Sequence, residues 1–408
     1  MHDLMNDLAT TVATEFFLRL DNENKENIQK DMLEKYRHMS FVREQYVAYK
    51  KFQTFERAKS LRTLLATSVG EETPGWYFYL SNKILSDLVP KLPLLRVLCL
   101  SGFQITEITR FHWLFETLEI AKLKDFKNLN EKISIEGLEK VQNAIHAHEA
   151  NLSQKRLSEL ELVWNDEQYD SRNVILEKEV LNELRPHDEK LIQFEIRSYG
   201  GLEFPSWVGD PSFLNLKHVS ISGCKRCTSL PPLAQLPSLK ELYIKGLYGV
   251  EVVNFELFVT GRTFPSLEIL SFSNMRGWKK WFGVVFPRLQ RLEIEDCPNL
   301  VEAKLVAMPS LKVLEINDCP SLVQLSVEAL TSLNVLVLDK CDSGVLRRLV
   351  EVASTVIKLE IRRISELNDV VWRGVIELLG AVEELRIEYC KEIRYMVKSD
   401  ADAKRGGG

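Results

Sequence analysis

The chain lacks several features that would assign a function directly. It has no run of about 18 uninterrupted apolar residues, the length that a membrane-spanning helix needs. It also has no G-x-x-x-x-G-K-[ST] phosphate-binding loop, no H-E-x-x-H zinc motif and no G-x-S-x-G nucleophile motif. Proline (14) and glycine (19) are few among 408 residues, which excludes a collagen-like or generally disordered chain. We therefore expect neither membrane insertion nor an enzyme.

The chain also lacks an excess of one charge sign. Its 53 Lys and Arg residues and 58 Asp and Glu residues give a net charge of −5, and the signs are interspersed. This balance argues against a nucleic-acid partner. Asp3 and Asp7 stand where a secretory signal has a basic start and an apolar core, and seven cysteines, an odd number, fit reduced thiols. We therefore expect a cytoplasmic protein.

What the sequence has in abundance is the repeated pattern apolar-x-x-apolar-x-apolar. We count eleven firm copies, which begin at residues 95, 157, 191, 216, 239, 267, 289, 311, 333, 356 and 382. The starts from 267 to 333 are separated by 22 residues each time, within the range of about 20–29 that is typical of leucine-rich repeats. Weaker copies begin at Leu61, Phe115 and Asn130. The period predicts an α/β leucine-rich-repeat solenoid.

Each copy predicts a short strand that pairs in parallel with the strand of the next repeat. Its alternating apolar residues should enter the core, because one repeat cannot bury its own apolar side. Proline-rich segments follow the strands, and they predict an irregular or short helical return path. We therefore expect a curved horseshoe with the parallel sheet on its concave face, and this face as the contact surface.

The residues that alternate with the apolar ones should form a charged concave surface. We take this set as candidate protein-binding residues: Lys217, His218, Lys240, Tyr243, Gln290, Arg291, Glu293, Lys312, Glu315, Lys358, Glu360, Glu384 and Arg386. Any single member is more often an ordinary solvated side chain, because fewer than about a third of interface residues contribute strongly to binding. The prediction therefore applies to the set.

Cysteine and tryptophan are expected in the core. Five cysteines share the ninth position of a repeat, where the leucine-rich pattern accepts Asn or Cys: Cys224, Cys297, Cys319, Cys341 and Cys390. The CxxC at residues 224–227 has no second CxxC or His pair at zinc spacing, so we predict no metal site. Trp207, Trp278 and Trp281 lie in return segments and are expected to pack inside the solenoid.

The amino-terminal region does not follow the repeat. Apolar residues recur at helical spacing in residues 1–18 and predict an amphipathic helix. Residues 21–35 are polar and predict a loop, whereas 38–43 (HMSFVR) return to alternation and predict the entry strand of the solenoid.

Several segments resemble landmarks of the plant coiled-coil NB-ARC leucine-rich-repeat (NLR) disease-resistance proteins. MHDLMNDLA (1–9) resembles the MHD motif that ends the winged helix of their nucleotide-binding module. FPSWVGDPSF (204–213) and LPPLAQLPSLKEL (230–242) resemble blocks of their repeat region. The resemblance implies a winged-helix remnant with a short helix and a linker at 1–60, and a leucine-rich-repeat domain at 61–397. Residues 398–408 are expected to be a disordered tail.

In this family the full-length protein binds ADP or ATP. The resemblance assigns His2 and Asp3 to the cofactor-binding MHD motif. Because the sequence has no phosphate loop, we expect no cofactor in this chain. The stretch from Gln104 to Asn130 is also shorter than its counterpart in the family, as if repeats were missing.

The resemblance implies the recognition and autoregulatory region of an intracellular plant immune receptor. Its partners would be a pathogen effector or a guarded host protein, together with the NB-ARC module in a full-length receptor. Activation would be a population shift driven by a ligand that binds the two arrangements differently. The alternatives are an F-box-type ubiquitin-ligase substrate adaptor, although residues 1–60 do not resemble an F-box, and a free-standing leucine-rich-repeat binding protein.

Overall fold

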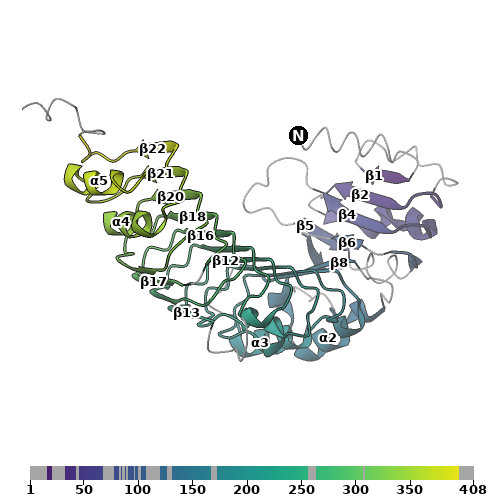
Figure 1. Cartoon of the computed structure of the whole chain (residues 1–408). Helices are drawn as coiled ribbons and strands as arrows, with labels where there is room; N and C mark the ends of the chain where they lie inside the picture. Colours follow the sequence, from purple (N-terminus) through teal and green to yellow (C-terminus); the bar gives the residue numbers. More distant parts are fainter. Residues whose placement is uncertain are drawn as a thin grey trace, which may run out of the picture. The chain divides into compact units, whose positions relative to one another are not determined.

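The computed structural model describes residues 16–20, 33–42, 46–67, 78–81, 84, 88, 91–95, 97–99, 103–106, 120–125, 131–166, 172–255, 263–306 and 308–394. The chain divides into two compact units. Unit 1 comprises Met1–Gly201 and Ser212–Leu216, and unit 2 comprises Leu202–Pro211 and Lys217–Gly408. The coloured elements of Figure 1 belong to the described residues.

Unit 1 contains one row of parallel strands, a second short sheet and several short helices. The row is β1 (Phe17–Leu20), β2 (His38–Val42), β4 (Thr63–Thr67), β6 (Val97–Cys99), β8 (Lys132–Glu136), β9 (Glu159–Val163) and β10 (Gln193–Arg197). The second sheet is β3 (Tyr46–Val47), β5 (Phe78–Ser81) and β7 (Phe103–Thr106). The α-helices are α2 (Ala144–Glu149) and α3 (Val174–Glu183), and the 3-10 helices span Tyr49–Lys51, Gln53–Arg57, Ile120–Asp125, Leu138–Lys140 and Leu152–Gln154.

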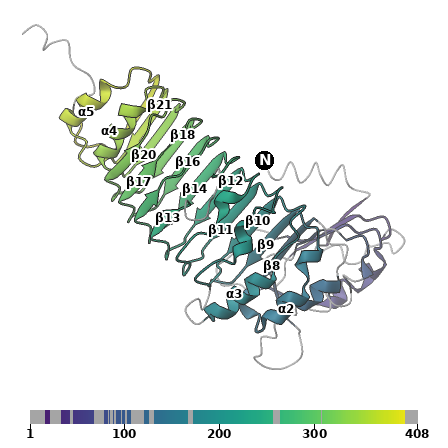
Figure 2. The same ribbon diagram turned by 60° about the horizontal axis from the view of Figure 1, so that its bottom comes forward.

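Unit 2 has the same organisation with more regular repeats. Its main sheet is β11 (His218–Ser222), β12 (Glu241–Lys245), β14 (Ile269–Ser273), β16 (Arg291–Glu295), β18 (Val313–Asn317), β20 (Val335–Asp339), β21 (Lys358–Arg362) and β22 (Glu384–Glu388). Its second sheet is β13 (Val252–Asn254), β15 (Lys280–Phe282), β17 (Glu302–Leu305) and β19 (Gln324–Val327). The helices in the described part of unit 2 are α4 (Ser343–Val352), α5 (Asp369–Ile376) and 3-10 helices at Ser206–Gly209 and Leu233–Gln235. Figure 2 shows the main strands from β11 to β21 side by side as successive rungs.

The stacked leucines confirm the predicted solenoid. Leu292, Leu314 and Leu336 are Cα partners on neighbouring strands and have no exposed surface. Burial of each leucine side chain contributes roughly 1.5–3 kcal/mol to the stability of the fold. All eleven firm copies of the sequence pattern contain a strand of a main sheet.

Among the weaker copies, two are also strands. The copy at Leu61 contains β4 and the copy at Asn130 contains β8, whereas residues 115–119 lie outside the described residues. Strand β6 pairs directly with β8, so no strand intervenes between them in the sheet.

The predicted return path is partly wrong. Four return segments of unit 2 are not irregular or helical but form the parallel strands β13, β15, β17 and β19. Three of these strands, β15, β17 and β19, lie in repeats of 22 residues, which have few residues left to cross back. Because an extended chain advances about 3.3 Å per residue and a helix only about 1.5 Å, a short return favours a strand. Strand β13 lies in the longer repeat that begins at residue 239, and it pairs in parallel with β15. Helices α4 and α5 lie in the repeats that follow β20 and β21.

The amino-terminal prediction is also corrected. Residues 17 and 18 do not belong to a helix, because Phe17–Leu20 is β1, which pairs in parallel with β2. The β-branched and aromatic residues near this point favour extended backbone. Residues 1–15 and most of the predicted loop at 21–35 lie outside the described residues. The predicted strand at 38–43 is observed as β2, but β1 precedes it in the sheet. The domain boundary at residue 60 stays a prediction.

Candidate functional site

The solvent side of the main sheet in unit 2 is formed by the first, third and fifth residues of each five-residue strand. In β16, Leu292 and Ile294 are buried, whereas Arg291 and Glu293 are partly exposed. Neighbouring strands pair without a shift in register, so residues at the same position form rows across the sheet. We call this surface the outward face.

The three rows of the outward face differ in chemistry. The first row is His218, Glu241, Ile269, Arg291, Val313, Val335, Lys358 and Glu384. The third row is Ser220, Tyr243, Ser271, Glu293, Glu315, Val337, Glu360 and Arg386. The fifth row is Ser222, Lys245, Ser273, Glu295, Asn317, Asp339, Arg362 and Glu388. Both charge signs, an aromatic residue and a few valines share one face.

Arg291 links two strands near the middle of this face. Its guanidinium donates to Glu293 on the same strand and, through Nη2, to Oε1 of Glu315 on β18 at 2.8 Å. The hydrogen bond to Glu293 and the charges of both carboxylates raise the pKa of Arg291 above its ordinary value. An arginine held in this way presents its remaining donors in a fixed direction, which suits recognition of another protein.

Tyr243 has a much larger side chain than its two neighbours in the third row. It is 38% exposed, and its partners in the register, Ser220 and Ser271, have short side chains. Its hydroxyl donates to Oε2 of Glu241 at 3.2 Å. Partial burial and the charge of Glu241 raise the pKa of Tyr243, so the phenol stays protonated at neutral pH. A rigid tyrosine between small residues is a typical anchor in protein interfaces.

Ion pairs fix other predicted residues. His218 Nδ1 lies 3.1 Å from Glu241 Oε2, and Lys358 Nζ lies 2.8 Å from Glu384 Oε1. Lys240 Nζ lies 2.7 Å from Oε1 of Glu268. Such exposed pairs contribute little to stability, about 0–1 kcal/mol each. They do set the direction in which the charges are presented.

Glu360 is less accessible than the sequence suggested. It lies on the outward face but is only 8% exposed. Arg362 donates to its carboxylate, and Arg386 Nη1 lies 3.7 Å from the same oxygen. The two longer arginine side chains cover it, so Glu360 orients its neighbours instead of offering a free contact.

Four predicted residues precede the strands. Lys217, Lys240, Gln290 and Lys312 each come one residue before a strand begins. Their carbonyls accept two N–H groups from the next repeat; for Gln290 the donors are Lys312 at 2.8 Å and Val313 at 3.0 Å. The strand starts at the third residue of the pattern, so the prediction that these four residues lie on a strand is wrong.

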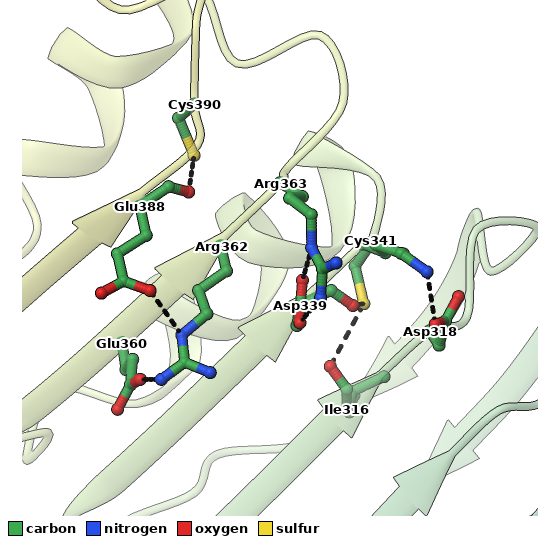
Figure 3. Close-up of polar contacts among 10 residues, drawn as sticks. Ile316, Asp318, Asp339, Cys341, Glu360, Arg362, Arg363, Glu388 and Cys390 are labelled. Carbon is green, nitrogen blue, oxygen red and sulfur yellow. Dashed lines mark hydrogen bonds and ion pairs between the residues drawn. The ribbon is translucent and has the colours of Figure 1, made fainter.

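The fifth row and the residues directly after it were missed. Lys340 Nζ lies 2.6 Å from Oδ2 of Asp318. Figure 3 shows Arg363, which donates from Nε to Oδ1 of Asp339 at 2.7 Å. Arg362 contacts Glu388 on β22 at 3.1 Å. The six-residue pattern ends one residue before the strand does, because each strand continues to a seventh residue. The available signal was the recurrence of charged residues shortly before the ninth-position cysteines.

A left-handed residue ends most of these strands. Asp296, Asp318, Lys340 and Tyr389 have φ between 48 and 58° and directly precede a cysteine. Each of these cysteine thiols donates to the carbonyl two residues earlier, as Cys319 does to Asn317 at 3.4 Å. The turn therefore satisfies a backbone acceptor at the point where the strand stops.

The predicted core positions of four cysteines and of the three tryptophans are confirmed. Cys224, Cys297, Cys319 and Cys341 are buried, and Cys390 is half-buried because it belongs to the last described repeat. Trp207, Trp278 and Trp281 are at most 4% exposed. Trp278 donates from Nε1 to the carbonyl of Lys280 at 2.9 Å.

His2 and Asp3 lie outside the described residues. Within the described ranges, no three His, Cys, Asp or Glu side chains are grouped so that they could hold a metal ion. None of the helices in that part of the chain is both long and apolar enough to span a bilayer.

Residues 120–247 match the family described as R13L1/DRL21 leucine-rich repeats. The chain is 27% identical over 406 residues to disease resistance RPP13-like protein 1 of Arabidopsis thaliana, with 74% of this chain and 38% of that protein covered. It is 30% identical over 401 residues to another Arabidopsis thaliana disease resistance protein, with 74% and 28% covered. It is 35% identical over 232 residues to disease resistance protein RGA4 of Solanum bulbocastanum, with 53% and 22% covered. The chain therefore spans well under half the length of these relatives.

Among solved structures, the chain is similar to a leucine-rich-repeat protein of Leptospira interrogans. The TM-score is 0.32 at 13% identity, with 92% of this chain and 89% of that chain covered. It is also similar to a chain in the Rad7–Elc1 complex of yeast, with a TM-score of 0.36 at 14% identity and coverage of 87% and 82%.

Proposed function

We propose that this chain, a leucine-rich-repeat solenoid similar to the repeat region of plant disease resistance proteins, recognises a protein partner through the outward face of unit 2. The observation that carries the proposal is the pair of ordered anchors on this face, Tyr243 and Arg291. Tyr243 is exposed between two serines, and Arg291 is held by Glu293 and Glu315. The remaining predicted residues would form the polar surroundings of these anchors.

A protein partner suits this face better than a nucleic acid. Acidic and basic side chains alternate over it, as Arg291, Glu293 and Glu315 illustrate. A phosphate backbone would need an excess of basic residues, and the chain as a whole is acidic. Complementary charges on a protein would instead steer association and fix the register of docking.

The relatives suggest what the partner is. These relatives are named as disease resistance proteins, and the chain covers only part of each. We infer an intracellular immune role in which the face binds a pathogen effector or a host protein that the effector modifies. In a longer receptor the same repeats would also dock on the NB-ARC module and restrain it. The role is binding, not catalysis.

Proximity labelling of the tagged full chain in plant cells tests the proposal. The test variant is Tyr243→Ala with Arg291→Ala. The matched control is Val252→Ala with Lys279→Ala, which removes one exposed apolar residue from β13 and one cation directly before β15. Proteins labelled by the wild type and the control, and lost with the test variant, are then purified. Their dissociation constants are measured against all three chains.

We expect the test variant to weaken binding by at least about tenfold, which corresponds to about 1.4 kcal/mol. Equal loss with both variants would show that the outward face is not the binding surface. Selective loss of a ubiquitin-ligase subunit would favour the adaptor function over the immune receptor.

A further inference from the structure

Strand β22 leaves one edge of the main sheet open. In the part of the chain that the structure describes, β22 pairs only with β21. The N–H of Glu384 donates to Ile357 at 3.0 Å, and the carbonyl of Glu388 accepts from Arg363 at 3.0 Å. Because successive residues of a strand direct their polar groups to opposite sides, Leu385 and Ile387 direct theirs to the open edge.

The apolar layer is open at the same edge. Leu385 is 42% exposed, whereas its partners in the register, Leu359 and Leu336, have no exposed surface. An exposed row of N–H and C=O groups above an apolar layer is a template for the addition of another strand. In such complexes the main chain supplies the hydrogen bonds and alternate side chains supply the specificity.

The charges on β21 and β22 specify what the added strand should carry. Lys358 Nζ lies 2.8 Å from Oε1 of Glu384, and Arg362 Nε lies 3.1 Å from Oε2 of Glu388. Between them, Arg386 lies 3.7 Å from Glu360. At each of these three positions, the charge on β21 is therefore opposite to the charge on β22.

We propose that the open edge of β22 binds an extended segment of a partner protein as a parallel strand with the pattern basic-apolar-acidic-apolar-basic. The two basic residues would face Glu384 and Glu388, and the acidic residue would face Arg386. The two apolar residues would cover Leu385 and Ile387. This surface shares the charged side chains of β22 with the outward face, but its other parts are the backbone edge and the apolar layer of that strand.

The chain itself supplies a probe with this pattern. Strand β21 is Lys-Leu-Glu-Ile-Arg, which already matches β22 on its other side. The probe is a fluorescein-labelled peptide of residues 355–364 (TVIKLEIRRI). The matched control peptide is TVIELKIERI, in which the three facing charges are reversed. Binding of each peptide to the full chain is followed by fluorescence anisotropy.

We expect saturable binding of the probe and at least about tenfold weaker binding of the control peptide, because opposed charges on paired strands stabilise and like charges destabilise. Glu384→Lys, at a side chain that is 62% exposed, should weaken binding of the probe and strengthen binding of the control peptide. Attraction through apolar side chains alone would not shift the two affinities in opposite directions.

Ile387→Pro tests the backbone part of the proposal. Proline removes the N–H that points to the open edge and is tolerated at a sheet edge when that N–H is not used. Its matched control, Ile387→Ala, loses more of the side chain but keeps the N–H. The melting temperatures of both variants are compared with that of the wild type to show that β22 remains folded.

We expect Ile387→Pro to abolish probe binding and Ile387→Ala to retain at least part of it. Equal affinity of the two peptides, absence of binding to the wild type, or undiminished binding to a folded Ile387→Pro chain would each overturn the proposal.

Discussion

Arg172 and Glu177 form a buried ion pair in unit 1, with 2.5 Å between Nε and Oε1 and only 6% of each side chain exposed. The second oxygen of Glu177 accepts from Arg172 Nη2 at 2.7 Å and from the N–H of Gly200 at 2.6 Å. The guanidinium also donates to the carbonyls of Asn165 and Ser198. The pair therefore ties the first turn of α3 to the ends of β9 and β10.

Glu177→Ala should destabilise unit 1 by about 3–5 kcal/mol, because it leaves the buried charge of Arg172 without its partner. Urea unfolding followed by circular dichroism measures the loss. The control is Glu351→Ala, which removes the acid of the exposed pair Arg347–Glu351 on α4 and should cost less than about 0.5 kcal/mol. Similar costs at the two sites would show that burial of the first pair is unimportant.

Core leucines of unit 2 should be far more sensitive than the lysine beside them. Leu314→Ala or Leu336→Ala should cost about 2–5 kcal/mol, since each residue is fully buried and leaves a cavity. Lys312→Ala should change stability by less than about 0.5 kcal/mol, because Lys312 is exposed and its ammonium makes a surface hydrogen bond to Oε1 of Gln290 at 3.2 Å. Chemical denaturation compares the three variants. Equal effects would contradict the observed alternation of β18 and β20.

The strand frame could be predicted from the sequence because it depends on a local, repeated property. A strand turns successive side chains to opposite sides, so Leu292, Leu314 and Leu336 had to share one side once their 22-residue spacing was recognised. The ninth-position cysteines followed from the same frame. The start and end of each strand were less certain, because Gln290 and Glu295 are both polar and the pattern alone does not show which one belongs to the strand.

The second sheet and the cover on Glu360 could not be predicted in this way. Both depend on contacts between residues that the repeat pattern treats separately. Strand β17 forms because it pairs in parallel with the extended segments β15 and β19 on its two sides. Glu360 is covered because Arg362 and Arg386, one of them on the next strand, reach it. Side-chain length and partner choice decide such contacts.

Cys390 should react with iodoacetamide before the cysteines of the preceding repeats. Hydrogen bonding to Cys319 and burial raise the pKa of Cys297, and burial raises the pKa of Cys341. Burial also raises the pKa of Cys390, but this thiol is only half-buried. Because the thiolate is the reactive form, labelling of Cys390 should increase with pH, while the buried thiols stay protected.

Peptide mass spectrometry at several times and pH values measures this order of labelling. The control is the chain unfolded in urea, in which the thiols of Cys297, Cys341 and Cys390 should react at similar rates. Early labelling of Cys297 or Cys341 in the folded chain would contradict the burial of these two thiols.

Arg291 and Glu315 should matter more for binding than for stability. Arg291→Ala, Glu315→Ala and the double variant form a double-mutant cycle, and the side chains are 42% and 25% exposed. We expect a coupling free energy of folding of about 0.2–1 kcal/mol that falls when the salt concentration rises, since exposed pairs are screened by solvent and ions. Denaturant titrations at low and high salt measure it. A salt-independent coupling several times larger would mean that the pair is part of the core and that Arg291 is not free to contact a partner.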